Sequence, residues 1–229
     1  MKNTFTVNQR FEFMEKLAIM VANSTTPSML VTGEGGLGKT HGVLEAVNSV
    51  LEQDDYVVQK GYSTPKGLYN FLYDNNGKLI IFDDCDSVLE KPVSLNILKG
   101  ALDSYDKRII SWESAARGDE YPNKFEFTGK VIFISNKKRD SIDQAVCSRS
   151  FVVDLSMSPS EKIERMETVL HKICPEISYE KKKEALELLD KNKDSIKDLN
   201  FRTLIKVSKI RNTFDSDWES LATYAMMES

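Results

Sequence analysis

The residues best suited to chemistry lie in one short segment, GEGGLGKT, residues 33 to 40. The segment satisfies the pattern G-x-x-x-x-G-K-[ST], in which glycines let successive backbone N–H groups turn inward around an anion. Lys39 would reach the β and γ phosphates of a nucleotide such as ATP, and the Thr40 hydroxyl would ligate Mg²⁺. The alternative, a flexible glycine turn before a helix, needs no ligand. The predicted nucleotide-contacting residues are Gly33, Glu34, Gly35, Gly36, Leu37, Gly38, Lys39, Thr40 and His41.

A phosphate loop needs a carboxylate nearby to hold the metal, and the apolar run LIIFDDCD ends in Asp83 and Asp84. Successive side chains of a strand point to opposite sides, so the two acids can divide the work. We expect Asp83 to ligate Mg²⁺ and Asp84 to face the attacking water. Asp86 is interpreted as a solvated or helix-capping group. Alone, the segment could also be a strand that ends in an acidic loop.

The pattern of the surrounding chain predicts the elements that position these residues. An apolar run ending at Gly33 precedes the loop and a helical pattern follows it, which is the strand, loop and helix order that the motif requires. Continuous apolar strands alternating with helices favour a parallel sheet covered on both faces. The predicted strands are residues 28–33, 56–62, 78–84, 130–136 and 150–155.

After Pro159 the sequence changes to charged, amphipathic helix without strands. The fold class is therefore predicted to be α/β, a P-loop NTPase three-layer parallel-sheet core with a small C-terminal all-helical lid. The predicted boundaries are residues 1–156 for the nucleotide-binding core and residues 157–229 for the lid. With about thirty residues before the loop, we expect a motor module without an appended recognition domain.

Composition limits the function classes. The chain has 229 residues, of which 41% are hydrophobic and 29% charged, and its net charge of -4 argues against a surface that is basic throughout. It has no run of about 18 apolar residues and no signal-peptide core, so we expect no membrane partner and a cytoplasmic location. Cys85, Cys147 and Cys174 fit neither a disulfide framework nor a zinc site and are predicted to be reduced, mostly buried thiols.

With these motifs in this order, the chain resembles the AAA+ ATPase family over nearly its whole length. VIFISN resembles the sensor-1 strand, which places Asn136 where it helps to orient the attacking water. AVCSRSFVVDL resembles the arginine-finger segment, with Arg149 acting on the ATP of a neighbouring subunit, and LNFRTL resembles sensor 2, with Arg202 contributed by the lid. The resemblance implies a five-stranded parallel core, ATP and Mg²⁺ as cofactors, and a homo-oligomeric ring.

Each of these three residues also has a simpler interpretation. Asn136 could end its strand as a turn former, Arg149 could be an ordinary surface arginine, and Arg202 could pair with an acid of the lid. The family most often has Asp-Glu where this chain has Asp83-Asp84, a pair that resembles the replication-initiator and helicase-loader branches. We expect slow hydrolysis.

Two segments could line the pore of a ring. KGYSTPKGLY, residues 60–69, lies where the family places its substrate-gripping loop and presents Lys60, Tyr62, Lys66 and Leu68. RIISW and KFEF could pair as a hairpin around a turn at Gly118 to Asn123, which resembles the pre-sensor-1 hairpin of helicase-like branches. Aromatics with basic groups suit single-stranded nucleic acid, and tyrosine with leucine suits an extended polypeptide. Tyr62, Tyr69 and Trp112 could also simply pack the core. The basic groups of the insertion are Lys107, Arg108, Arg117 and Lys124.

Three functions remain open: an ATP-driven ring motor or loader on nucleic acid, a ring that remodels a protein partner, and a nucleotide-gated assembly switch with slow hydrolysis. The hairpin insertion, the Asp83-Asp84 pair and the basic groups favour nucleic acid slightly. Compact size and the likeness of NGKLIIFDDCDSVL to virus-encoded AAA+ proteins suggest a phage or viral replication role, which would place the protein in the host cytoplasm.

Overall fold

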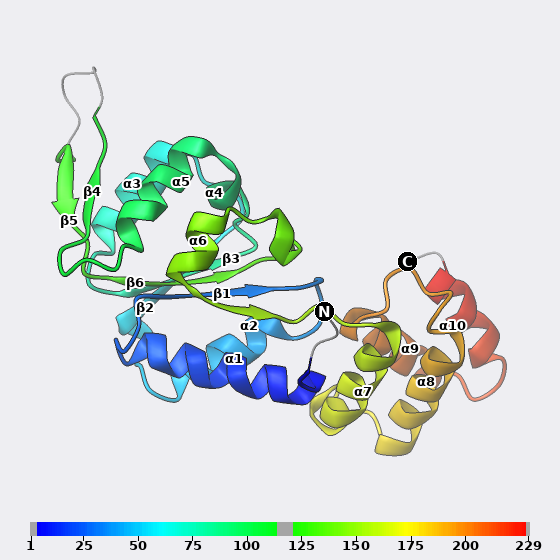
Figure 1. The fold of residues 1–229 in the computed structure, drawn as a ribbon. Helices are drawn as coiled ribbons and strands as arrows, with labels where there is room; N and C mark the ends of the chain where they lie inside the picture. Colours follow the sequence, from blue (N-terminus) through cyan, green and yellow to red (C-terminus); the bar gives the residue numbers. More distant parts are fainter. Residues whose placement is uncertain (1–3, 114–120, 228–229) are drawn as a thin grey trace. The chain divides into compact units, whose positions relative to one another are not determined.

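The structure is a computed structural model that describes residues 4–113 and 121–227 (Figure 1). By the contacts among its residues, the chain divides into two compact units. The α/β unit contains residues 9–34 and 39–156, and the helical unit contains residues 4–8, Gly35–Gly38 and residues 157–227. Four residues of the glycine loop therefore pack with the helical unit rather than with the sheet.

The α/β unit is built on a five-stranded sheet in the order β2-β3-β6-β1-β7, with every neighbouring pair parallel. The parallel core expected from the sequence is confirmed. All residues of β1 and β3 are buried, as expected of strands covered on both faces. The strands are β1 (Ser28–Thr32), β2 (Tyr56–Lys60), β3 (Leu79–Asp83), β6 (Lys130–Ile134) and β7 (Phe151–Asp154).

Helices cover both faces of this sheet (Figure 1). Helices α1 and α2 lie on one face, and α3, α4, α5 and α6 lie on the other. On the second face Ile80 and Phe82 of β3 pack in one core with Leu68 of α3 and Leu98 of α5. The bounds are α1 (Val7–Ala22), α2 (Lys39–Asn48), η1 (Gln53–Asp55), α3 (Pro65–Asp74), α4 (Ser87–Glu90), α5 (Pro92–Ala101), η2 (Arg139–Ser141) and α6 (Gln144–Arg149).

A separate two-stranded hairpin joins β4 (Ile109–Ser111) to β5 (Lys124–Glu126) in antiparallel register. This confirms the predicted pairing of RIISW with KFEF, although Arg117 and part of the predicted turn lie outside the described residues. Two aromatics offered as pore-lining groups pack inward instead. Tyr69 is 1% exposed, and its ring lies edge-on to Phe125 at 5.3 Å and 6.3 Å from the half-buried Trp112.

The helical unit contains four α-helices in its described part and has an apolar core of its own. Met166, Leu189, Leu204 and Trp218 come from different helices and pack together in that core. Three of its α-helices have a capped start, for example the one that follows Ser158, whose side chain accepts from the Glu161 backbone N–H. The helices are α7 (Pro159–Val169), η3 (Leu170–Lys172), α8 (Tyr179–Asn192), α9 (Phe201–Thr213) and α10 (Trp218–Met227).

Among the described residues no helix is long and apolar enough to cross a membrane. The three cysteines are free thiols, as predicted. Only Cys85 is buried, however, whereas Cys147 and Cys174 are partly exposed, so the expectation that they are mostly buried was wrong.

Candidate nucleotide-binding site

The carboxyl ends of β1, β3 and β6, which are neighbours in the sheet, carry the predicted polar residues. The glycine loop follows β1, Asp83 ends β3 and Asp84 comes next, and Asn136 lies two residues beyond β6. Because parallel strands end at the same edge of a sheet, residues more than forty positions apart in sequence meet there. Lys39 and Thr40 join them from the first turn of α2.

Lys39 is the best connected of these residues. Its side chain is 5% exposed, and its Nζ donates to the carbonyl oxygens of Gly33 and Glu34, both at 2.7 Å. A third bond, 2.8 Å long, runs to Asn136 Oδ1. All three ammonium hydrogens are therefore used, so the lysine is held in place before any ligand arrives.

Burial lowers the pKa of Lys39 from its ordinary value of 10.5 to about 8. The nearby carboxylates Asp84, Asp83, Asp86 and Glu34 act in the opposite direction, because their negative charge favours the ammonium. A phosphate group beside Lys39 would add negative charge at closer range. The site is therefore prepared for an anion that restores the full charge of this lysine.

Asn136 links Lys39 to the second acid of the pair. Its Nδ2 donates to Asp84 Oδ1 at 2.6 Å while its Oδ1 accepts from Lys39. Asp84 has a backbone φ of 53°, which is uncommon for a non-glycine residue, and its backbone N–H donates to Ile134 O at 3.0 Å. The turn exposes Asp84, whereas Asp83 is 4% exposed. The two acids therefore differ in access to water, and their roles stay predictions.

Thr40 and Asp83 form the oxygen pair expected of a Mg²⁺ site, with Thr40 Oγ1 donating to Asp83 Oδ1 at 2.8 Å. Among residues 4–113 and 121–227 no group of three or more His, Cys, Asp or Glu could hold a metal ion. Mg²⁺ typically takes one or two protein oxygens and completes its shell with phosphate oxygens and water. The pair fits a nucleotide-borne Mg²⁺ and not a metal held by protein alone.

Sequence reasoning missed Lys60 as a member of this site. Lys60 ends β2 and is the register partner of Asp83 on β3, and its Nζ lies 3.0 Å from Asp83 Oδ2. Its side chain is 66% exposed, so the ammonium reaches in from the surface. A cation thus already neutralises the carboxylate that is predicted to ligate Mg²⁺. The sequence shows a lysine at the end of a predicted strand. Predicting its contact with Asp83 also required knowing which strand lies next to it in the sheet.

Asp86 also differs from its interpretation as a solvated or capping group. It stands at the N-cap position of α4, yet its side chain makes no capping bond. Instead its Oδ1 accepts from Ser135 Oγ at 2.6 Å, and Ser135 Oγ in turn accepts from the Lys137 backbone N–H. Asp86 therefore fixes the segment that carries Asn136.

Two glycines of the loop are required by its geometry. Gly33 has a φ of 132°, and a Cβ there would lie 2.8 Å from the carbonyl carbon of Leu155. Gly36 has a φ of 75°, and a Cβ there would lie 3.0 Å from Asn200 Cγ. Gly36 O also accepts from the Phe201 backbone N–H at 2.9 Å, a contact within the helical unit. Substituting either glycine would force the loop out of this conformation.

Arg149 is not brought together with the other predicted residues of the α/β unit. It ends α6 just before β7, and its backbone carbonyl accepts from Ser28 Oγ at 2.9 Å, at the amino end of β1. The glycine loop follows the other end of that strand, about 16 Å away at about 3.3 Å per residue. Arg149 Nη1 donates to Ala145 O of its own helix at 3.1 Å. The structure thus separates Arg149 from the phosphate loop of its own chain.

Arg202 and His41 are both exposed. Arg202 lies in the first turn of α9, where its backbone N–H donates to the capping Asn200 Oδ1 at 2.9 Å. His41 Nε2 lies 3.6 Å from Glu45 Oε2 in the next turn of α2, and the His41 side chain is 80% exposed. Their roles as nucleotide contacts stay predictions.

Comparisons with known proteins match this fold. The chain is 28% identical over 241 residues to an uncharacterised 36.7 kDa protein from the nrdC–mobD intergenic region of enterobacteria phage T4, covering 95% of this chain and 73% of that protein. A mutant of RuvB from Thermotoga maritima superposes with a TM-score of 0.60 at 15% identity, over 96% of this chain and 68% of that one. No family model matches the chain.

A third protein, NtrX from Brucella abortus in complex with ADP, superposes with a TM-score of 0.54 at 11% identity, over 94% of this chain and 52% of that chain. The sheet and the loop site define a P-loop nucleoside triphosphatase fold. The chain therefore shares the fold of RuvB and NtrX, as expected from its resemblance to the AAA+ ATPase family.

Proposed function

We propose that the protein binds ATP with Mg²⁺, hydrolyses it slowly, and uses the cycle to act on a macromolecule as an assembly of several copies. The observation that carries the proposal is the connected set at the sheet edge. Lys39, Asn136 and Asp84 form one chain of hydrogen bonds, and Thr40 and Asp83 form a second pair beside it. These are the residue types and contacts that phosphoryl transfer requires.

The residues of this set have distinct tasks in the proposed reaction. Lys39 exchanges its carbonyl acceptors for oxygens of the β and γ phosphates, and Thr40 and Asp83 hold the metal, which when bound neutralises charge on the phosphate oxygens. Asp84, the exposed acid, orients the attacking water and accepts its proton. Asn136 holds Asp84 in position. The bond between Asn136 and Lys39 keeps the acid and the phosphate-binding group in one frame.

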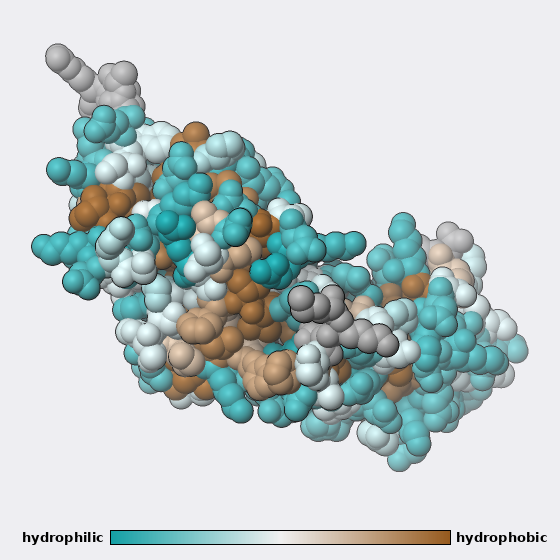
Figure 2. Space-filling model, viewed as in Figure 1, coloured by the Kyte–Doolittle hydropathy of each residue, from teal (hydrophilic) through white to brown (hydrophobic). Residues whose placement is uncertain are grey.

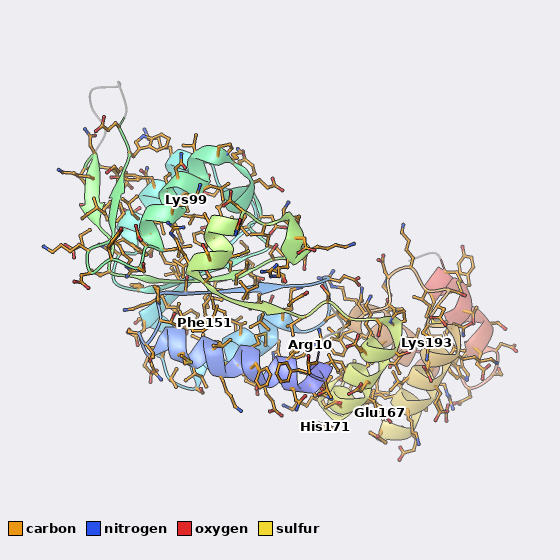
Figure 3. The ribbon with its side chains drawn as sticks, viewed as in Figure 1. Arg10, Lys99, Phe151, Glu167, His171 and Lys193 are labelled. Carbon is orange, nitrogen blue, oxygen red and sulfur yellow. The ribbon has the colours of Figure 1, made fainter. Side chains whose placement is uncertain are left out.

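Assembly is the second part of the proposal and depends on the position of Arg149. Because this side chain cannot reach its own phosphate loop, it contributes only if a second copy brings its nucleotide to the amino end of β7. Two residues further on, Phe151 is 46% exposed on the edge strand β7 (Figure 3). Apolar residues gather on this face of the α/β unit (Figure 2). An exposed apolar edge strand next to Arg149 suits contact with a second copy.

Nucleic acid is the favoured macromolecule, as the sequence analysis indicated, and the hairpin is the candidate contact. Lys107 and Lys124 are exposed beside β4 and at the start of β5. Exposed lysines suit a phosphate backbone, whereas Arg108 donates to the backbone carbonyls of Ala101 and Gly129 and Trp112 packs against the core. A polypeptide partner is favoured by Tyr62, which is 65% exposed and carries Lys91 Nζ 4.4 Å from its ring centroid.

The phage T4 relative supports a phage origin, which would place the protein in the cytoplasm of a host cell, and the replication role is proposed from the sequence motifs alone. Measuring the ATPase rate with single-stranded DNA, duplex DNA and unfolded protein separates the candidate partners. Stimulation by single-stranded DNA supports nucleic acid as the partner. Stimulation by unfolded protein alone would show that the partner is a polypeptide instead. No stimulation by any of them favours the third function, a slow nucleotide-gated assembly switch.

Subunit mixing tests the assembly. Arg149→Ala is expected to bind ATP normally but to lose most hydrolysis, because such an arginine contributes about 10³ to 10⁵ in turnover in related enzymes. Arg139→Ala, a surface control, should change little. Mixing Arg149→Ala with Lys39→Ala subunits should restore part of the activity. If Arg149→Ala hydrolyses ATP at the wild-type rate and turnover per subunit does not depend on protein concentration, the proposed assembly is wrong. The proposed nucleotide site is not affected by that result.

A further inference from the structure

A second polar pocket lies at the opposite end of the sheet from the phosphate loop. It measures about 320 Å³ and is formed entirely by the α/β unit. The turn after α1, the segment between α5 and β4, and the first residue of β6 enclose it. The lining residues are Ser24, Thr25, Thr26, Pro27, Asp103, Ser104, Tyr105, Arg108 and Lys130. We call this the amino-end pocket.

Two cations face this pocket, and one of them is fixed. Arg108 donates to Ala101 O at 2.9 Å and to Gly129 O at 2.7 Å, and its guanidinium lies 5.2 Å from the centroid of the Phe127 ring. These contacts are all to uncharged groups. Because a guanidinium stays protonated in proteins, Arg108 places a permanent positive charge on one wall of the pocket.

Lys130 supplies the second positive charge of the pocket. It begins β6 and is partly buried, and within the described part of the chain its side chain makes no hydrogen bond or ion pair. Burial and the charge of Arg108 lower the pKa of Lys130. The one acid of the lining, Asp103, accepts from the Ser104 backbone N–H at 2.8 Å and pairs with neither cation. An anion would relieve the repulsion between the two cations.

The remaining walls offer hydrogen-bond donors. Ser24 has a φ of 62° and sits in the turn that ends α1, where its backbone N–H donates to Val21 O. Ser24, Thr25 and Thr26 of this turn line the pocket, and each carries a hydroxyl group. Within residues 4–113 and 121–227 none of these three hydroxyls makes a hydrogen bond. Unused hydroxyl donors beside an unpaired ammonium are the groups that coordinate a phosphate oxygen.

We propose that the amino-end pocket binds a phosphate group. The Lys130 ammonium supplies the opposite charge, and the hydroxyls of Thr25 and Thr26 donate hydrogen bonds to the phosphate oxygens. The pocket is larger than one phosphate, so the group arrives as part of a phosphodiester or with a further phosphate attached. This site is distinct from the nucleotide site. Lys130 begins β6 and Asn136 lies two residues beyond its other end, so the whole strand, about 13 Å long at about 3.3 Å per residue, separates them.

The test uses the full chain with its nucleotide site filled by ADP and Mg²⁺. Inorganic phosphate, pyrophosphate and a single-stranded oligonucleotide are titrated in turn, and the amide signals of Thr25, Thr26 and Lys130 are followed by NMR. Lys130→Met removes the charge, Thr26→Val removes one donor at constant shape, and Lys16→Met, on the exposed side of α1, is the control for loss of a surface charge.

We expect these signals to shift in the wild type and in Lys16→Met. Affinity should fall about tenfold in Lys130→Met and less in Thr26→Val, since a charge-assisted bond is stronger than a neutral one. A response to phosphate or pyrophosphate identifies a free phosphate ligand. A response to the oligonucleotide alone, with a salt slope lowered by about one in Lys130→Met, identifies a phosphodiester. If no probe shifts these amides, or Lys130→Met binds like the wild type, the proposal is wrong.

Discussion

Binding of ATP should take up a proton at Lys39. In the nucleotide-free protein the pKa of this lysine is about 8, lowered by burial from 10.5. A phosphate group beside the ammonium stabilises its charged form and raises the pKa again. The terminal phosphate of ATP is already ionised near pH 8, because its last pKa is about 6. The proton that is taken up when the complex forms therefore goes to the lysine.

The size of the effect follows from the pKa. Near pH 7 about nine-tenths of Lys39 is already protonated, so uptake is about 0.1 proton per ATP. Near pH 9 about nine-tenths is neutral, and uptake approaches about 0.9. Because the protonated form binds ATP, affinity is constant well below pH 8 and decreases above it. Between pH 7 and pH 9 it should fall about tenfold, provided that the pKa in the complex exceeds about 10.

Calorimetry in two buffers of different ionisation enthalpy measures the proton count directly. The observed binding enthalpy should depend on the buffer near pH 9 and hardly at all near pH 7. Lys39→Arg is the matched variant, because a guanidinium stays charged at both pH values, so any binding it retains should show no proton uptake. Equal enthalpies in both buffers near pH 9, with unchanged affinity, would refute the reasoning about this buried lysine.

Three further outcomes are expected. Lys60→Met removes the ammonium that competes for Asp83, so the Mg²⁺ concentration needed for half-maximal ATP binding should fall about two- to fivefold, a modest change because the lysine is mostly exposed. Asp84→Asn should bind Mg²⁺ and ATP normally but hydrolyse about 10² to 10⁴ times more slowly, and equal turnover would exclude Asp84 as the base. Gly33→Ala should lower the melting temperature at least twice as much as Gly61→Ala, because both glycines have positive φ but only Gly33 lies against a backbone carbonyl.

The site could be predicted where the sequence pattern itself brings residues together. Lys39 and Thr40 follow a motif, and Asp83 and Asn136 follow apolar strands whose ends must share one edge of a parallel sheet. Lys60 could not be predicted in the same way. Its contact with Asp83 depends on β2 lying next to β3 in register, and strand order is set by packing rather than by local pattern.

Features at the amino end of the sheet were harder to predict from the sequence. Arg149 was named as a candidate arginine finger, but its separation from the phosphate loop of its own chain depends on its contact with Ser28 and on where β7 begins. The amino-end pocket has no motif. Its Thr25 and Lys130 are more than a hundred positions apart and are ordinary residues in ordinary sequence. Tyr69 likewise carries no sequence signal that separates a pore-lining aromatic from the buried one it proves to be.

The most direct measurement is ATP binding by the wild type and by Lys39→Ala, followed by calorimetry with Mg²⁺ present and paired with thermal melts of both proteins. The structure predicts that the wild type binds ATP and that Lys39→Ala melts as a folded protein, because the ammonium contacts three polar groups rather than the apolar core. Lys39→Ala should bind ATP at least about a hundredfold more weakly, because it lacks the charge that would bind phosphate. A folded Lys39→Ala protein with wild-type affinity for ATP would contradict the assignment of this loop as the nucleotide site.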